Sequence, residues 1–112
     1  MSLARDARLW LRAHRYGLLS THSTAVAGYP FGSVVPYVLD HDGCPVLLIS
    51  RLAEHTKNLA ANPHTSLLTH EQGPNVQAQA RVTLVGKAEC VQARTPSRRD
   101  TRVTSRIPQG TA

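Results

Sequence analysis

The sequence predicts a single mainly β domain, a small antiparallel β-barrel with flanking helices. Its length of 112 residues corresponds to one domain with one modest core. Five segments have the composition of strands, and most of them are joined by hairpin-like turns. Only two segments have helical periodicity, which is too few for the alternating strand–helix units of a parallel sheet.

The first expected element is an N-terminal helix. Ser2 is a suitable N-cap, and Gly17 is a suitable stop. Between them, the side chains that share one helix face are Leu3, Ala7, Trp10, Leu11 and His14. This pattern predicts a helix that packs on the barrel through one face.

The strands and a second helix follow in order. Strands are expected over residues 18–21, 31–40, 46–49, 65–69 and 78–91, and a helix over 52–61, closed by Asn62-Pro63. In the last strand Val82 and Leu84 alternate with Arg81, so the arginine lies on the opposite face. Because five strands barely close a barrel, a sixth is expected either in the C-terminal residues or not in this chain.

Positive charge is concentrated at the C-terminus. The chain has 13 Lys/Arg against 7 Asp/Glu, a net charge of +6, and after Ala93 five arginines stand against Asp100 alone. We therefore expect a domain over residues 1–93 and a basic, flexible tail over 94–112. A nucleic-acid-binding arm is the alternative, although no aromatic residue alternates with these arginines.

Several function classes have no support in the sequence. No apolar run approaches the roughly 18 residues that cross a membrane, and charged residues interrupt the N-terminal segment where a signal peptide needs apolar ones. The six histidines and two cysteines lack metal-ligand spacing, so no metal site is expected. Serine-nucleophile, phosphate-loop and dinucleotide motifs are missing. The expectation is a cytoplasmic protein.

The most suggestive segment joins the third strand to the second helix. Ser50 ends the strand, and His55, Thr56 and Lys57 follow in the first turns of the helix. A helix N-terminus has unpaired backbone N–H groups and a positive potential, so it suits a phosphate. The alternative is that Ser50 is a turn residue and Lys57 a solvated side chain.

Two further features are candidates for ligand contact. Residues 32–37 combine a glycine with an internal proline, which leaves backbone groups unpaired that could bond a flat, polar-edged ring. Arg81 faces away from the aliphatic side of its strand, toward solvent, a ligand or a partner.

These features, in this order, resemble the FMN-binding split barrel of the pyridoxamine 5′-phosphate oxidase-like superfamily, most closely its HugZ/HutZ-like haem-utilisation branch. The matching stretches are residues 16–21, 28–37, 50–63 and 80–89, and the similarity covers about residues 3–92. The stretch 50–63 is the part of the match that is most specific to this superfamily. The resemblance implies a split-barrel homodimer with FMN between the subunits, and a flavin-dependent oxidoreductase activity on an unknown small molecule.

The resemblance also assigns site residues, position by position. On the ring side they are Ser33, Val34, Val35 and Pro36, and on the phosphate side Ser50, His55, Thr56, Lys57 and Arg81. No catalytic side chain is assigned.

The chain departs from the family pattern in two places. Strict pyridoxamine phosphate oxidases have Ser-Arg-Lys where this chain has Ala53-Glu54-His55, which argues against that activity, and Glu54 is expected to point away from a phosphate. The pattern also stops near Val91, so the barrel is expected to be shortened and haem degradation is not expected. A non-catalytic dimeric module that binds flavin or haem is therefore the alternative, and FMN, a deazaflavin and haem all stay open as its ligand.

Overall fold

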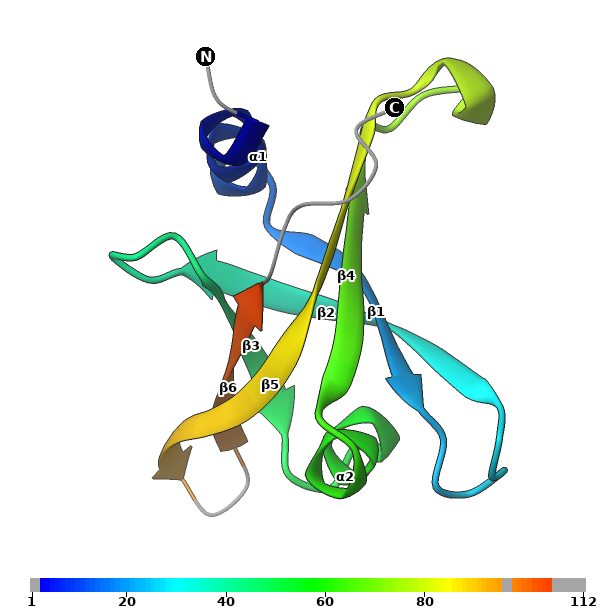
Figure 1. Ribbon diagram of the computed structural model, residues 1–112, viewed down its shortest axis with the longest axis vertical. Coiled ribbons are helices and arrows are strands. Elements are labelled where there is room, and N and C mark those ends of the chain that lie inside the picture. The colour runs from blue at the N-terminus through cyan, green and yellow to red at the C-terminus, as the bar shows by residue number, and fades with distance from the viewer. Residues whose placement is uncertain (1–2, 96–97, 106–112) are drawn as a thin grey trace.

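The computed structural model describes residues 3–95 and 98–105 (Figure 1). Along the chain its elements are α1 (Leu3–Arg12), β1 (Tyr16–His22), β2 (Pro30–Leu39), β3 (Pro45–Ser50), α2 (Glu54–Ala61), β4 (His64–His70), the 3-10 turn η1 (Val76–Ala78), β5 (Arg81–Thr95) and β6 (Arg98–Ser105). None of the described helices is long and apolar enough to cross a lipid bilayer.

The strands form one closed antiparallel barrel. Around it the order is β1-β2-β3-β6-β5-β4, and every neighbouring pair is antiparallel. Helices α1 and α2 lie at opposite ends of the barrel (Figure 1). The predicted mainly β barrel with flanking helices is confirmed.

Alternate side chains of the strands fill the barrel, as the period of two requires. The most deeply buried apolar side chains, each at most 1 % exposed, are Leu19, Val35, Leu47, Leu67 and Val103. In β5 the predicted alternation holds, because Val82 and Leu84 are buried while Arg81 is only partly buried.

The C-terminal residues supply the sixth strand. β6 pairs with β3 on one side and β5 on the other, and its Val103 is fully buried. The expected boundary after residue 93 falls inside β5, and the expectation of a flexible tail and a barrel that stops near Val91 is wrong for 98–105. The physical reason is that β6 places a single large apolar side chain in the core, so its arginine-rich composition conceals a barrel strand. Residues 106–112 of the predicted tail lie outside the described residues.

The N-terminal helix is attached to the barrel by one buried apolar side chain and by two hydrogen bonds donated by aromatic side chains. Leu11 is buried, the Trp10 indole N–H donates to Thr69 Oγ1 at 2.6 Å, and the Tyr37 hydroxyl donates to the Leu11 carbonyl at 2.7 Å. Burial raises the pKa of Tyr37 to about 12, so this hydroxyl keeps its proton and remains a donor. The predicted helix is thus confirmed, with Leu11 and the partly buried Trp10 packed on the barrel.

Candidate cofactor site

Strand β2 has two halves with different partners. Its C-terminal half pairs with β3 through Tyr37↔Leu47, Val38↔Val46 and Leu39↔Pro45. Residues 30–36 pair with β1, but no described strand pairs with their other edge. The predicted ring-side segment therefore has an unpaired backbone edge, which suits Pro36 because proline has no N–H to offer a neighbouring strand.

The side chains of this segment alternate between the core and the surface. Val35 is 1 % exposed and belongs to the core, so it could contact a ligand only through its backbone. Val34 is 63 % exposed on the outer face, and Pro36 is exposed there as well. Ser33 Oγ is buried and has no hydrogen-bond partner among the described residues, a condition that costs about 1–3 kcal/mol.

The junction between β3 and α2 is held by the two hydroxyl residues predicted for the phosphate side. The Thr56 hydroxyl donates to the Ser50 carbonyl, and the Leu52 amide donates to Ser50 Oγ at 3.2 Å. Thr56 is 6 % exposed. Both side chains therefore have structural partners, and their clearest role is to fix the turn that leads into α2.

The first turn of α2 has unpaired donors. Its N-cap, Ala53, has an extended backbone and makes no side-chain capping bond. Among the described residues no group accepts a hydrogen bond from the amides of Glu54 and His55. His55 Nε2 is buried without a partner, and burial lowers the pKa of this histidine, which favours the neutral ring. A buried anion is the kind of ligand that these donors could bind.

The two charged side chains of this turn lie at the surface. Lys57 Nζ is 3.7 Å from Glu54 Oε1, and both side chains are about half exposed. This pairing keeps the Glu54 carboxylate at the surface next to Lys57. It also offsets part of the positive charge that Lys57 would offer to a phosphate.

Arg81 does not lie with the other phosphate-side candidates. It pairs with His70, the last residue of β4, whereas α2 leads into the first residue of that strand, His64. Six residues of strand at ~3.3 Å each separate the two ends by about 20 Å. Arg81 lines a cavity of about 480 Å³ together with Leu18 and Leu68. A single copy of the chain therefore does not bring Arg81 to the α2 start.

Comparison with known proteins places this architecture in a family. The family model described as pyridoxamine 5′-phosphate oxidase matches residues 3–110. The chain belongs to this family. It is 43% identical over 91 residues to a chloroplastic heme oxygenase, HOZ, of Arabidopsis thaliana, a match that spans 81% of this chain and 28% of that protein.

Two solved structures show the same fold. A heme-binding protein from Mycobacterium smegmatis is 28% identical, with a TM-score of 0.78 over 92% of this chain and 51% of that one. HutZ, described as the heme storage protein from Vibrio cholerae, is 20% identical, with a TM-score of 0.77 over 98% of this chain and 93% of that one. The superfamily that the sequence resembles is thus confirmed.

This family member has one polar feature that sequence reasoning missed, a pair of histidines on one groove. His14 and His70 both line a cavity of about 470 Å³, together with Leu18, Val34 and Leu68. His14 Nδ1 is 2.7 Å from the Trp10 carbonyl and His70 Nδ1 is 2.8 Å from the Glu71 carbonyl. A carbonyl can only accept, so each Nδ1 carries the proton and each neutral ring has its lone pair on Nε2. No local motif reveals this pair, because 55 residues separate the two histidines.

Proposed function

We propose that this member of the pyridoxamine 5′-phosphate oxidase family binds FMN, with the phosphate at the start of α2. The observation that carries the proposal is a set of unpaired donors at one place: the amides of Glu54 and His55 and the buried ring nitrogen of His55. A neutral imidazole with its proton on Nε2 still donates a hydrogen bond from that atom, although a weaker one than an imidazolium makes, so the lowered pKa of His55 is compatible with this role.

The ring would lie along the unpaired edge of β2. Within residues 31–36, the backbone groups of alternate residues point to this edge and can bond the polar rim of an isoalloxazine, and the Ser33 hydroxyl supplies a buried polar atom that has no partner among the described residues. The bound flavin would supply hydride or single-electron chemistry, and the chain would hold and orient it. On this basis we propose a flavin-dependent oxidoreductase. A module that binds flavin without turnover is the alternative.

A second copy of the chain would complete the site. The outer face of β1 and β2 exposes the large apolar side chains of Tyr16, Leu18 and Val34, and Leu18 pairs directly with Val34. A continuous apolar face of this kind favours a protein partner. A homodimer would cover it, and it would allow Arg81 of one copy to approach the α2 start of the other.

Haem is the second candidate, because the His14–His70 groove favours it. An imidazole whose Nδ1–H is bonded to a carbonyl presents Nε2 as a metal ligand, which is the usual second-shell arrangement of metal-bound histidines. The apolar floor of the groove suits a porphyrin. The matches to a heme oxygenase and a heme-binding protein support this candidate.

Titration of the purified chain with FMN and with haemin distinguishes the two candidate cofactors. If FMN binds as proposed, His55→Gln and Ser33→Ala each weaken FMN affinity by about tenfold or more, the loss expected for one buried hydrogen bond to a charged ligand. His41→Gln changes an exposed histidine on the β2–β3 turn and is the matched control. Sedimentation of the FMN-loaded chain should show a dimer. No FMN binding, or equal affinity in all variants, would contradict the proposal.

The haemin arm of the titration tests the second candidate. If the groove holds haem, His14→Ala or His70→Ala changes the Soret band of the complex, and His55→Gln does not. Reduction of bound flavin by NAD(P)H or a reductase then distinguishes an oxidoreductase from a flavin-binding module.

A further inference from the structure

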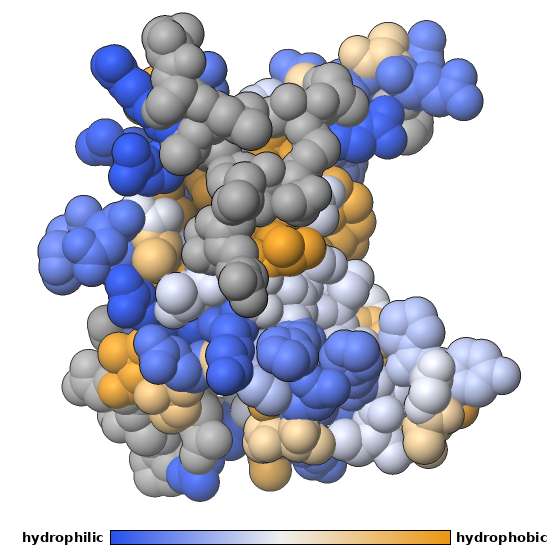
Figure 2. Space-filling view, in the orientation of Figure 1, coloured by the Kyte–Doolittle hydropathy of each residue, from blue (hydrophilic) through white to orange (hydrophobic). Residues whose placement is uncertain are grey.

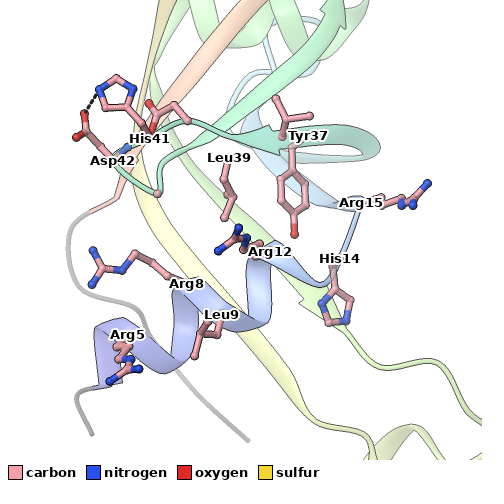
Figure 3. A pocket seen from close by; sticks show the side chains of 13 residues that line it. Arg5, Arg8, Leu9, Arg12, His14, Arg15, Tyr37, Leu39, His41 and Asp42 are labelled. Atoms are coloured by element: carbon pink, nitrogen blue, oxygen red, sulfur yellow. Dashed lines mark hydrogen bonds and ion pairs between the residues drawn. The ribbon is translucent and has the colours of Figure 1, made fainter.

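The largest cavity described in the molecule lies away from the candidate cofactor site. It has a volume of about 1050 Å³ and lies between α1 and the hairpin that joins β2 to β3. Figure 3 shows its two walls, with arginine side chains extending from α1 on one side and the turn at residues 40–43 on the other. In the space-filling view, hydrophilic side chains gather over the same two segments (Figure 2).

One wall of this cavity is strongly cationic. Arg5, Arg8, Arg12 and Arg15 all line it; the first three follow one side of α1 at spacings of three and four residues, and Arg15 lies just after the helix. From Arg5 to Arg12 the helix rises by about 10 Å. Among the described residues, no carboxylate forms an ion pair with Arg8, Arg12 or Arg15. These three guanidinium groups can therefore bind an anion without breaking an ion pair.

The carboxylates of the facing wall offset these arginines only in part, because both have a partner of their own in Arg102. Arg102 donates from Nε to Asp40 Oδ2 at 2.7 Å and from Nη2 to Asp42 Oδ2 at 3.2 Å. Arg102 comes from β6 and is not among the residues that line the cavity. Both carboxylates on the turn are thus paired with a side chain of the barrel.

Arg8 is also held in place. Gly43 has a φ of +81°, and a Cβ atom at this position would lie 2.6 Å from Arg8 Cδ. The aliphatic stem of Arg8 therefore passes directly over the glycine of the turn. Figure 3 shows Arg8 and Arg12 in the space between α1 and the hairpin, with Arg5 and Arg15 at its two ends. A guanidinium that is positioned before binding loses less conformational freedom on binding an anion.

The cavity also has an apolar part. Leu9 and Val38 are 53% and 52% exposed, and both line it. Leu39 lies beside them on the same wall. A bare inorganic anion would leave these side chains uncovered, whereas a ligand with a planar apolar group would cover them. The volume is at the upper end of the range for small-molecule sites, roughly 300–1,000 Å³, which favours a small molecule over a protein or nucleic-acid surface.

We propose that this cavity binds a nucleoside di- or triphosphate, with the phosphates on Arg8 and Arg12 and the base on Leu9 and Val38. Bidentate contacts from planar guanidinium groups match phosphate oxygens in geometry as well as charge. This site is separate from the proposed FMN phosphate site, since it uses α1 and the hairpin and none of the residues at the start of α2; His14 lies on the border between this cavity and the haem groove.

Calorimetric titration of the full chain with ADP tests the proposal, with the single tryptophan, Trp10 on α1, as a fluorescence reporter. We expect Arg12→Gln to weaken ADP affinity by about tenfold or more. Arg12→Lys should weaken it by less, because lysine keeps the charge but lacks the planar guanidinium group that makes bidentate contacts. Lys87→Gln removes the same charge from an exposed position on β5 and is the matched control, with less than about a twofold effect.

Further ligands and one variant distinguish the outcomes. Pyrophosphate should bind more weakly than ADP through the same arginines, and adenosine more weakly still. His55→Gln should lose FMN affinity but keep ADP affinity, so failure at one site does not imply failure at the other. Absence of ADP binding, binding unaffected by Arg12→Gln, or Arg12-dependent binding of RNA or an acidic peptide without ADP binding would each overturn the proposal.

Discussion

The two ends of the barrel are closed by helices that are attached by different chemistry. Helix α1 is held by the apolar Leu11 and by the ring donors of Trp10 and Tyr37, so its outer side is free to carry arginines. Helix α2 is held by a buried amide, Asn58, whose Nδ2 donates to Thr21 Oγ1 at 3.0 Å. Each helix thus has one core side chain, Leu11 in α1 and Leu59 in α2, and the difference lies in the added hydrogen bonds, from aromatic rings at α1 and from a buried amide network at α2.

This difference changes what an unpaired polar group means at each end. Among the described residues, no carboxylate pairs with Arg8 or Arg12 of α1; both side chains are exposed, so they cost little and indicate only a positive surface. The unpaired Ser33 Oγ and His55 Nε2 at the α2 end are buried, and each costs about 1–3 kcal/mol in the absence of a partner. Because the buried side chains of Asn58 and Thr56 have hydrogen-bond partners, two buried atoms without one favour a ligand as the missing partner.

The strongest test of the comparison is removal of the polar attachment of α2. Asn58 is 1% exposed, and its Oδ1 accepts from both the amide and the hydroxyl of Thr24, at 3.0 and 3.1 Å. Asn58→Ala should lower the free energy of unfolding by about 3 kcal/mol, since it removes these bonds and the one to the buried Thr21 Oγ1. Urea denaturation measures the loss.

The control for this variant lies one residue away. Lys57→Ala removes an exposed side chain from the same helix and should change the free energy of unfolding by less than about 0.5 kcal/mol. Equal effects of the two substitutions would show that α2 is not held by its buried amide.

A second test concerns the strand that spans the two ends. Val103 in β6 is fully buried, so Val103→Ala should cost about 2 kcal/mol, the usual range for deletion of buried methyl groups. Thr104→Ala, at the exposed neighbouring position, should cost less than about 1 kcal/mol. If Val103→Ala had no effect on the unfolding midpoint, residues 98–105 would not contribute to the barrel and the original expectation of a tail would return.

Whether a strand could be predicted from the sequence depends on whether its own side chains fill the core. Strands with alternating apolar residues, such as the one that contains Val82 and Leu84, can be predicted because their own side chains fill the core. β6 could not be predicted, since it relies on pairing with β3 and β5 and contributes only Val103 as a large apolar core side chain. A strand whose stability comes from its neighbours has no local signature.

In the candidate site, too, the features with a local sequence signal could be predicted and the features set by distant contacts could not. The α2 start could be identified because helix N-termini have a general chemistry and the residues are contiguous. Nothing local indicates that Thr56 has a partner at Ser50 while His55 has none, or that Arg81 lies at the far end of β4. The arginines of α1 did have a signal, their helical spacing, but it is visible only when the polar face of the helix is examined as well as the apolar one.

The smallest predicted effect is at the α1 end and depends on pH. Partial burial alone would raise the pKa of Asp40, but hydrogen bonds from the amides of Cys44 and Asp42, together with Arg102, lower it below the ordinary value of 3.8. A carboxylate with a lowered pKa in the folded state stabilises that state above its unfolded pKa, and the stabilisation is lost as the pH falls through the folded value. Asp40→Asn should therefore lower the urea midpoint at neutral pH, and the difference from the unmodified chain should shrink as the pH falls below about 4.

Two measurements give this last test its control. Asp6→Asn removes an exposed carboxylate from α1 and should lower the midpoint at neutral pH less than Asp40→Asn does. Because Asp40 is joined to Arg102 by a short ion pair, part of its effect should persist in salt that screens exposed charges. A difference that stays constant from neutral to acidic pH would mean that the turn is held by its backbone alone, and the facing wall of the arginine-lined cavity would then not depend on Arg102.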